Sequence, residues 1–211
     1  MDYPPVQVKV WGKYACFTRP EMKVERVSYP VMTPSAARGV LEAIFWKPEF
    51  TWRVREIHVL APIRHFSLVR NEVCRRMSKD SLNMDVSDPN VRTQRHTLGL
   101  TDPAYLIVAD VVPKPGVVED PAKFRDQFRR RVERGQCYHR PYLGCREFAA
   151  SFAKPDGSER QQSINEPLGL MLLDLEYQAD GPAVPHFFPA ELTDGVLHVP
   201  DYTFNVQGGA A

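Results

Sequence analysis

The sequence lacks long hydrophobic runs, and its first residues lack the features of a secretion signal. No apolar run approaches the roughly 18 residues that a membrane-spanning helix needs. Residues 1–12 contain neither the basic region nor the apolar core of a signal peptide. We therefore expect a cytoplasmic protein without a membrane partner.

Cysteine is also scarce, at 4 of 211 residues. Cys16, Cys74, Cys137 and Cys145 show no CxxC or CxxH spacing, which is the usual signature of a zinc site. The spacing therefore predicts no metal site. In the cytoplasm it also predicts reduced thiols without disulfides.

Basic residues are missing from the last part of the chain. Residues 1–160 hold all 27 lysines and arginines against 19 acidic residues, whereas residues 161–211 hold seven acidic residues and no basic one. The basic part has the charge for contact with a polyanion, although an ordinary solvated surface explains the same excess. We expect the acidic part to face solvent or a protein.

The strongest local pattern predicts a helix that begins after Thr33, with Pro34 at its first position, and ends before Pro48. Its apolar residues recur at helical spacing. They are Ala37, Val40, Leu41, Ile44 and Phe45. This spacing places one face on a core and turns Arg38 and Glu42 outward.

Gly39 lies inside this predicted helix. A glycine there costs roughly 1 kcal/mol relative to alanine. Its presence indicates either a close packing contact or a nearby phosphate, and we interpret it as a packing contact.

A second helix is predicted from Asp120, a good N-cap, to about Arg134, with Gly135 just beyond its end. Its buried stripe is Phe124, Phe128 and Val132, and its remaining surface carries Arg125, Arg129, Arg130, Arg131 and Arg134. Asp126 is placed to pair with Arg130. The basic surface is either solvated or turned toward RNA.

The remaining pattern predicts strands and one long excursion. The strands fall at residues 6–11, 51–63, 104–112 and 142–152, and three more follow at 168–177, 186–188 and 196–199. The excursion, at about 64–99, is rich in arginine and reads as a basic arm or β-hairpin. The first four strands and two helices follow the βαββαβ order of ferredoxin-like RNA-recognition domains.

We therefore predict an α+β fold in two domains. Residues 1–160 form a ferredoxin-like domain with the long basic arm. Residues 161–211 form a small C-terminal antiparallel β-sheet domain around a turn at Asp194-Gly195.

Residues 14–29 mix aromatic side chains with Arg19, Lys23 and Arg26. Single-stranded nucleic acid needs stacking faces next to cations that pair with phosphates, and this composition offers both. The alternative is a loop that its aromatic residues hold on the core.

Several separated stretches resemble one known family. They are VKVWGKYACFTRPEMKVERVSYPVMTPSAARGVLEAIFWKP, RNEV, AKF at the start of the second helix and YLGCREFAASF. In this order, across most of residues 6–177, they are similar to the CRISPR-associated Cas-five family in its type I-C form, which processes precursor CRISPR RNA.

The resemblance implies a ferredoxin-like domain, a small β-sheet domain and an enzyme that cuts RNA without a metal or other cofactor. The implied partners are the repeat hairpin of precursor CRISPR RNA and the other subunits of a type I-C Cascade-like complex. In such a cut the RNA 2′-OH loses a proton as it attacks phosphorus, and the leaving 5′-oxygen gains one. A lysine can stabilise the charge that grows on the phosphoryl oxygens.

The family assigns this chemistry to a Tyr or His near the end of the first helix and to a Lys-His pair at the start of the second. This sequence has Phe45 at the first position and Lys123-Phe124 at the second. Phenylalanine cannot transfer a proton, so of these residues only Lys123 is retained.

The nearest replacements by sequence are Tyr138 and His139, just before a glycine turn. The predicted catalytic residues are therefore Lys123, His139 and Tyr138. His65 and His96, in the arm, are weaker candidates. An exposed loop histidine is the alternative reading of His139.

Eight basic residues are predicted phosphate contacts, some at positions that match the family's motifs. They are Arg19, Arg26, Arg38, Lys47, Arg70, Arg75, Arg76 and Arg146. For each of them, an ion pair inside the protein is the competing explanation.

The leading hypothesis is a metal-independent CRISPR-repeat endoribonuclease that stays bound to the 5′ handle of its product within a type I-C surveillance complex. The alternative is a non-catalytic subunit that binds the handle. A second alternative is a basic nucleic-acid-binding module with affinity for duplex DNA, whose binding would depend on salt and not on the repeat sequence.

Overall fold

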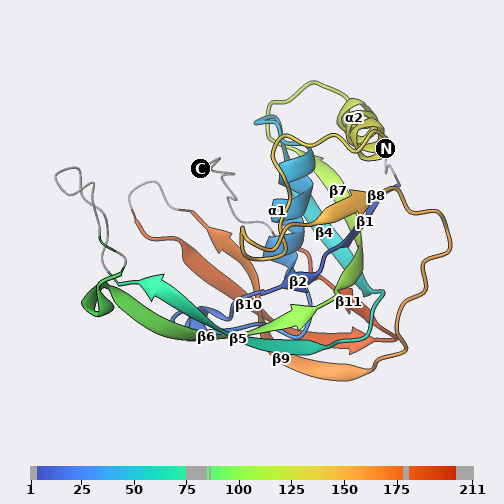
Figure 1. The fold of residues 1–211 in the computed structure, drawn as a ribbon. Coiled ribbons are helices and arrows are strands. Elements are labelled where there is room, and N and C mark those ends of the chain that lie inside the picture. The colour runs from blue at the N-terminus through green and yellow to red at the C-terminus, as the bar shows by residue number, and fades with distance from the viewer. Residues whose placement is uncertain (1–3, 75–84, 86, 178–180, 203–211) are drawn as a thin grey trace.

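One antiparallel sheet of seven strands runs through the computed structural model, which describes residues 4–74, 85, 87–177 and 181–202 (Figure 1). The strand order is β8-β1-β7-β4-β11-β10-β9. The strands are β1 (Val6–Trp11), β4 (Phe50–Val59), β7 (Ala104–Pro113), β8 (Ser151–Ala153), β9 (Glu166–Glu176), β10 (Val184–Thr193) and β11 (Val196–His198). The mixed α+β class predicted from the sequence is confirmed.

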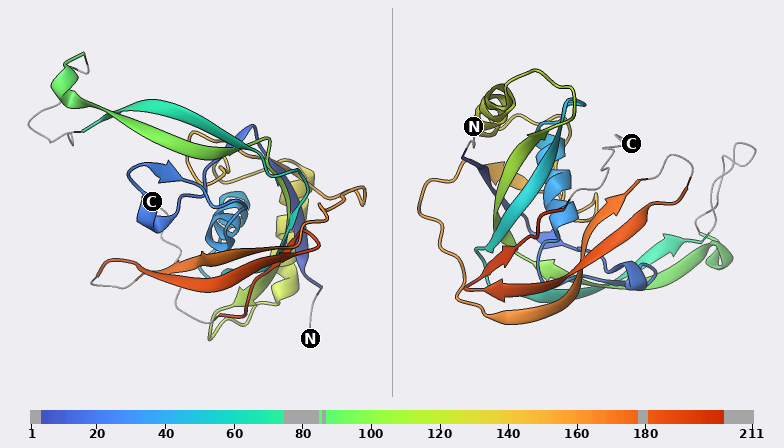
Figure 2. Two further views of the ribbon diagram at one scale, coloured as in Figure 1. Left: turned by 90° about the horizontal axis from the view of Figure 1, so that it is seen from below. Right: turned by 180° about the vertical axis from the view of Figure 1, so that it is seen from behind.

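Four of these strands, β8-β1-β7-β4, are neighbours in the sheet and are separated along the chain by two helices. Helix α1 (Pro34–Ile44) precedes β4, and helix α2 (Pro121–Glu133) lies between β7 and β8. This arrangement is compatible with the ferredoxin-like order. Helix α1 contacts both β4 and β9, and it lies among the strands when the molecule is seen from below (Figure 2).

The three C-terminal strands extend the same sheet. Strand β11 pairs with β4, where Leu197 lies opposite Ile57. The predicted turn between β10 and β11 is present, with positive φ angles at Asp194 and Gly195. The division into domains at residues 160 and 161 stays a prediction, because these strands share one sheet with the N-terminal part.

A smaller sheet contains β2 (Tyr14–Ala15), β3 (Arg26–Val27), β5 (His65–Val73) and β6 (Arg92–Thr101), with two short 3-10 helices, η1 (Pro20–Met22) and η2 (Pro89–Val91). Strands β5 and β6 form an antiparallel hairpin that projects from the body of the molecule (Figures 1 and 2). The predicted arm is therefore a hairpin. Residues 75–84 and 86, between its strands, lie outside the described residues, as does the 205–211 stretch at the C-terminus.

Helix α1 begins as predicted and ends earlier than predicted. The Thr33 side chain accepts a hydrogen bond from the Ala36 N–H at 3.3 Å, and Pro34 follows it. The helix ends at Ile44 because Phe45 already has extended backbone angles. Pro48 therefore marks the limit of the pattern but not the end of the helix.

Gly39 is not explained by packing, contrary to our interpretation. A Cβ atom at this position would have no described neighbour within 4 Å. The glycine lies on the side of α1 that borders an open pocket, so no close approach within the described chain requires it.

The prediction from helical spacing that Arg38 faces outward is wrong. Only 7% of this residue is exposed. Its guanidinium donates two hydrogen bonds of 2.7 Å to the carboxylate of Asp174 on β9, and a third of 2.7 Å to Glu42. Burial alone would lower the pKa of Arg38, but the two carboxylates outweigh it and raise this pKa above its ordinary value. Asp174 is itself fully buried, so the acidic part of the chain does not simply face solvent.

Helix α2 follows its predicted cap and stripe. Asp120 accepts from the Ala122 N–H at 2.9 Å, Gly135 has a φ of +62°, and the three predicted apolar residues are buried. Two details differ. Arg125 is buried, and Asp126 pairs with Arg129 at 3.8 Å in place of Arg130.

The predicted strand 142–152 is mostly a loop, and β8 covers only Ser151–Ala153. The loop closes on itself, since the N–H of Leu143 donates to the carbonyl of Phe148 and the N–H of Phe148 donates to that of Cys145. Gly144 has a φ of +84° and lies against the Cys16 carbonyl, where a Cβ atom would be only 2.0 Å away. The apolar residues here are buried by a turn and not by a strand, so the predicted strand over 142–152 is wrong except at its end.

The Arg38–Asp174 ion pair should be costly to break on one side only. Arg38→Ala leaves a buried carboxylate without its partner, and we expect the free energy of unfolding to fall by about 3–5 kcal/mol. The double variant Arg38→Met with Asp174→Leu should lose much less, because no charge remains buried. Urea unfolding measures both values, and equal losses in the two proteins would contradict this role.

Candidate functional site

Three segments meet at the C-terminal end of helix α1. The N–H of Tyr138 donates to the carbonyl of Ala43 at 2.8 Å, and the N–H of His139 donates to the same oxygen at 3.3 Å. Arg131, on α2, donates from its guanidinium to the carbonyl of Ile44 at 2.9 Å. The last carbonyls of a helix have no partner inside the helix, so these bonds fix the loop and α2 against its end.

Beneath this junction lies a cluster of aromatic rings. Phe50 is its centre, with ring centroids 5.6 Å from Phe45 and 5.0 Å from Phe124. Trp52 packs on the other side of Phe50 at 5.2 Å and donates its indole N–H to the carbonyl of Phe45 at 2.9 Å. Phe45 and Phe124 are 2% and 1% exposed. Both rings are therefore part of the core, out of reach of a substrate.

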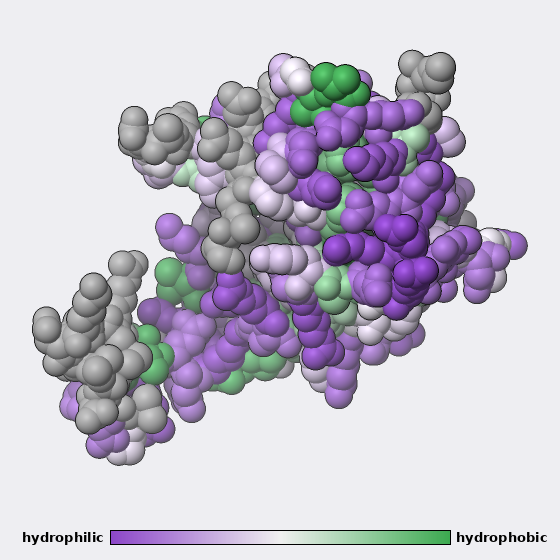
Figure 3. All heavy atoms as spheres, turned by 90° about the horizontal axis from the view of Figure 1, so that it is seen from above, coloured by the Kyte–Doolittle hydropathy of each residue, from purple (hydrophilic) through white to green (hydrophobic). Residues whose placement is uncertain are grey.

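Two lysines lie next to Phe124 of the aromatic cluster. Lys123 is exposed on the first turn of α2, and the ammonium of Lys47 lies 5.9 Å from the centre of the Phe124 ring. Tyr138 is 76% exposed and its ring centre lies 5.9 Å from that of His139. Lys47 and Lys123 thus lie next to Phe124 of the aromatic cluster, and the backbone of Tyr138 and His139 is bound to the end of α1. The side of the molecule that carries α2 is mostly hydrophilic (Figure 3).

Arg131 is a site residue that sequence reasoning missed, because we assigned it to the outer basic surface of α2. Its guanidinium carbon lies 5.3 Å from the centre of the Phe45 ring. It follows Phe128 by three residues and Phe124 by seven, so helical spacing places it on the buried face. That spacing was the available signal.

The other predicted phosphate contacts lie apart from this junction. Arg19 lies 4.5 Å from the centre of the Tyr29 ring and 3.7 Å from the Glu21 carboxylate. Arg146 is exposed, and Arg38 is held in its buried ion pair. Arg75 and Arg76 lie outside the described residues. RNA contact by these residues stays a prediction.

Arg26 and Arg70 form a second cluster, which joins the β5–β6 hairpin to the 142–149 loop. Arg26 lies 3.6 Å from the carboxylate of Glu72 and 3.7 Å from that of Glu147, and Arg70 donates to Glu147 as well. Arg70 also lies 5.7 Å from the centre of the Phe148 ring. Ion pairs inside the protein therefore occupy both arginines, which was the competing explanation for them.

Cys145 lies within this second cluster. Arg26 donates to its sulfur at 3.3 Å. The hydrogen bond with the Cys16 thiol and the neighbouring Arg26 guanidinium together lower the pKa of Cys145 to about 6, against burial and the charge of Glu147. Cys16 is more deeply buried than Cys145, and its pKa is raised. Of the two thiols, Cys145 has the lower pKa because its sulfur lies next to the Arg26 guanidinium and next to the Cys16 thiol.

The weaker histidine candidates are exposed on the hairpin, His65 on β5 and His96 on β6. The hairpin and α2 lie at opposite ends of the view in Figure 1. The structure therefore does not bring these histidines to the end of α1.

Comparison with known proteins identifies the family. The model for the family described as "CRISPR-associated protein (Cas_Cas5)" matches residues 6–200. The chain belongs to the Cas5 family. Within this family, the relatives named Cas5d and the resemblance found in the sequence both indicate the type I-C form.

Two curated relatives of this Cas5 chain are both named "CRISPR pre-crRNA endoribonuclease Cas5d". The protein from Thermus thermophilus is 48% identical and covers 92% of this chain and 91% of its own. The protein from Mannheimia succiniciproducens is 43% identical and covers 93% and 95%.

Solved structures share the fold. One described as "Crystal Structure of CRISPR-associated Protein" has a TM-score of 0.68 at 22% identity and covers 93% of this chain and 92% of its own. A chain of a "CRISPR RNA-guided surveillance complex" has a TM-score of 0.50 at 12% identity and covers 88% and 91%.

Within residues 4–74, 85, 87–177 and 181–202, no group of three or more His, Cys, Asp and Glu side chains could hold a metal ion. In the same part of the chain, neither helix has the length and apolar character to cross a membrane.

The low pKa of Cys145 predicts a pH-dependent contribution to stability. Because the folded pKa of about 6 lies below the ordinary value of 9.0, the contribution is complete above pH 9 and is lost as the pH falls through 6. We expect the stability difference between wild type and Cys145→Ala to shrink as the pH falls from 9 to 6. Urea unfolding under reducing conditions measures this difference. The same exchange at the exposed Cys137 controls for loss of a thiol, and a difference independent of pH would contradict the prediction.

Proposed function

We propose that this Cas5 protein is a CRISPR-repeat endoribonuclease that cuts precursor CRISPR RNA and stays bound to the 5′ handle of its product. The observation that carries the proposal is the attachment of Tyr138 and His139 to the end of α1, together with the position of Lys47 next to the ring of Phe124, the neighbour of Lys123. The names of the two curated relatives, at 48% and 43% identity over nearly the whole chain, support the same activity.

The proposed reaction is a transesterification within the RNA. The 2′-oxygen loses its proton and forms a bond to phosphorus, the bond from phosphorus to the 5′-oxygen breaks, and that oxygen takes up a proton. The products are a 2′,3′-cyclic phosphate and a 5′-hydroxyl. No redox change occurs, and no metal enters the proposed steps.

Each of these four residues has chemistry that suits one role in the reaction. His139 exchanges a proton with a reacting oxygen, since imidazole titrates near neutral pH. Tyr138, next to it, orients the RNA and donates a hydrogen bond. Lys123 stabilises the charge that develops on the phosphoryl oxygens, and Lys47 adds a second positive charge. Arg131 holds the end of α1 in place.

The second candidate is a subunit that binds the 5′ handle without cutting it. The burial of Phe45 and Phe124 favours it, because the positions that the family uses for proton transfer carry no ionisable group here. In both cases we infer that the protein works in the cytoplasm, where its four free cysteines stay reduced, and joins the other subunits of a type I-C surveillance complex.

The reaction type is tested with labelled repeat RNA and EDTA. We expect one cut at the base of the repeat hairpin in the presence of EDTA, and no cut when the nucleotide that supplies the attacking oxygen is 2′-deoxy. A cut that persists in the deoxy RNA would exclude attack by the 2′-OH. Tight binding of the normal RNA without any cyclic-phosphate product over hours would support the second candidate.

The catalytic assignment is tested with Lys123→Ala and His139→Gln. We expect each variant to lower the cleavage rate by about 10² or more while the affinity for repeat RNA changes little. Lys154→Ala is the control, because Lys154 pairs with Glu133 near the last turn of the same helix, at 2.7 Å. A variant that cuts at the wild-type rate would remove its residue from the mechanism.

A further inference from the structure

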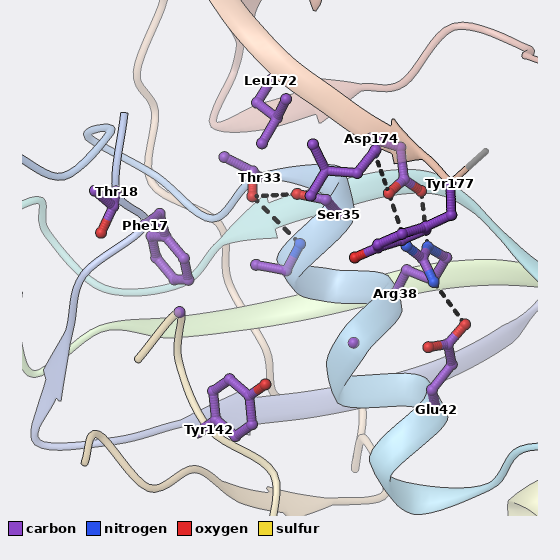
Figure 4. Close-up of a pocket in the computed structure, with 14 residues that line it drawn as sticks. Phe17, Thr18, Thr33, Ser35, Arg38, Glu42, Tyr142, Leu172, Asp174 and Tyr177 are labelled. Carbon is purple, nitrogen blue, oxygen red and sulfur yellow. Dashed lines mark hydrogen bonds and ion pairs between the residues drawn. The ribbon is translucent and has the colours of Figure 1, made fainter. Parts of the chain in front are cut away.

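A pocket of about 390 Å³ lies along helix α1, and its lining on the helix runs from Ser35 to Glu42. Helix α1 forms its floor, β9 and Tyr177 form one wall, and residues 17–18 and 142–144 form the others (Figure 4). We call this space the α1 pocket. Its size lies in the range of sites that hold small molecules or single chemical groups.

The floor of the α1 pocket contains Gly39. Glycine is unfavourable inside a helix, and here, apart from the helix's own backbone and the adjacent residues, no described atom lies within 4 Å of the place that a Cβ of this exposed glycine would take. Packing inside the chain therefore does not account for this residue. A group that enters the pocket from outside would account for it, because any larger side chain at this position would take up its space.

The charge of the α1 pocket disfavours a phosphate. Arg38 lines it, but the carboxylates of Asp174 and Glu42 bind the Arg38 guanidinium at 2.7 Å each, so negative charge exceeds positive charge. An anion would meet these carboxylates without a free cation to balance them. The pocket therefore fits an uncharged group.

Polar and aromatic groups on the walls fit a nucleobase. Tyr142 and Tyr177 offer aromatic rings as well as hydroxyls, and Thr18 and Ser35 offer further hydroxyls. Unstacked RNA bases are held in this way, by stacking on aromatic rings and by hydrogen bonds to their edges.

Basic residues flank the pocket in the sequence. Arg19 follows Thr18, and the exposed Arg146 lies two residues after Gly144, which also lines the pocket. A base in the pocket would leave its phosphates outside, where such cations can meet them. A pocket without a free cation, with cations on neighbouring residues of the chain, suits the base of a nucleotide better than its phosphate.

We propose that the α1 pocket binds one unpaired base of the repeat RNA, in a subsite separate from the cleavage site at the other end of α1. This proposal rests on the proposed function, because it assumes repeat RNA as the ligand. It gives the protein a point of sequence recognition that does not depend on the residues that cut.

The test replaces Gly39 by a residue whose side chain occupies the α1 pocket. Gly39→Trp places a large side chain in the space, whereas Gly39→Ala adds only a methyl group and serves as the matched control. Both replacements should keep or raise the melting temperature, since both residues suit a helix better than glycine. Affinity is measured for wild type and both variants with repeat RNA and with a set of repeat RNAs that each carry one abasic nucleotide.

We expect Gly39→Trp to weaken binding of the intact repeat RNA about tenfold, the size of one lost base contact, and Gly39→Ala to bind like wild type. One abasic RNA should bind wild type about tenfold more weakly and lose nothing further with Gly39→Trp. Equal binding by wild type and Gly39→Trp would overturn the proposal, as would a loss that is the same for every abasic RNA.

The outcomes separate this proposal from the proposed function. If wild type binds and cuts repeat RNA and Gly39→Trp does both equally well, the pocket proposal alone fails. If wild type binds no repeat RNA, both fail together.

Discussion

The Arg38–Asp174 ion pair sets the position of helix α1, and the position of α1 decides where both functional regions lie. Arg38 comes from the basic part of the chain and Asp174 from the acidic part, and the two residues meet with almost no exposure to solvent. A buried pair contributes little net stability, but a misplaced helix would leave both charges without partners. The pair therefore selects one arrangement of α1 against β9.

The two ends of α1 carry different chemistry as a result. At its C-terminal end the helix carbonyls accept hydrogen bonds from the Arg131 side chain and from the backbone N–H groups of Tyr138 and His139. Along its N-terminal half, Arg38 is neutralised and the walls carry hydroxyls and rings. The proposed cleavage site and the proposed base-binding pocket therefore share one helix.

The family's positions for proton transfer have a structural role in this member. Phe45 and Phe124 pack on Phe50 in one aromatic cluster, which supports the end of α1 and the first turn of α2. A tyrosine or histidine can place a polar atom at the surface, whereas these two rings are held in the core. Phe45 and Phe124 therefore leave proton transfer, in the proposed reaction, to residues of neighbouring segments.

Most of the local elements could be predicted from the residues alone, because caps, turns and apolar spacing act between residues a few positions apart. Thr33, Asp120 and the Asp194-Gly195 turn lie where they were predicted, and the family was recognisable from its motifs. The burial of Arg38 and the open pocket next to Gly39 depend on how distant segments pack, so the local pattern did not predict them. The partner of Arg38 is 136 residues away, and a helix pattern shows which side chains share a face but not which distant strand covers it.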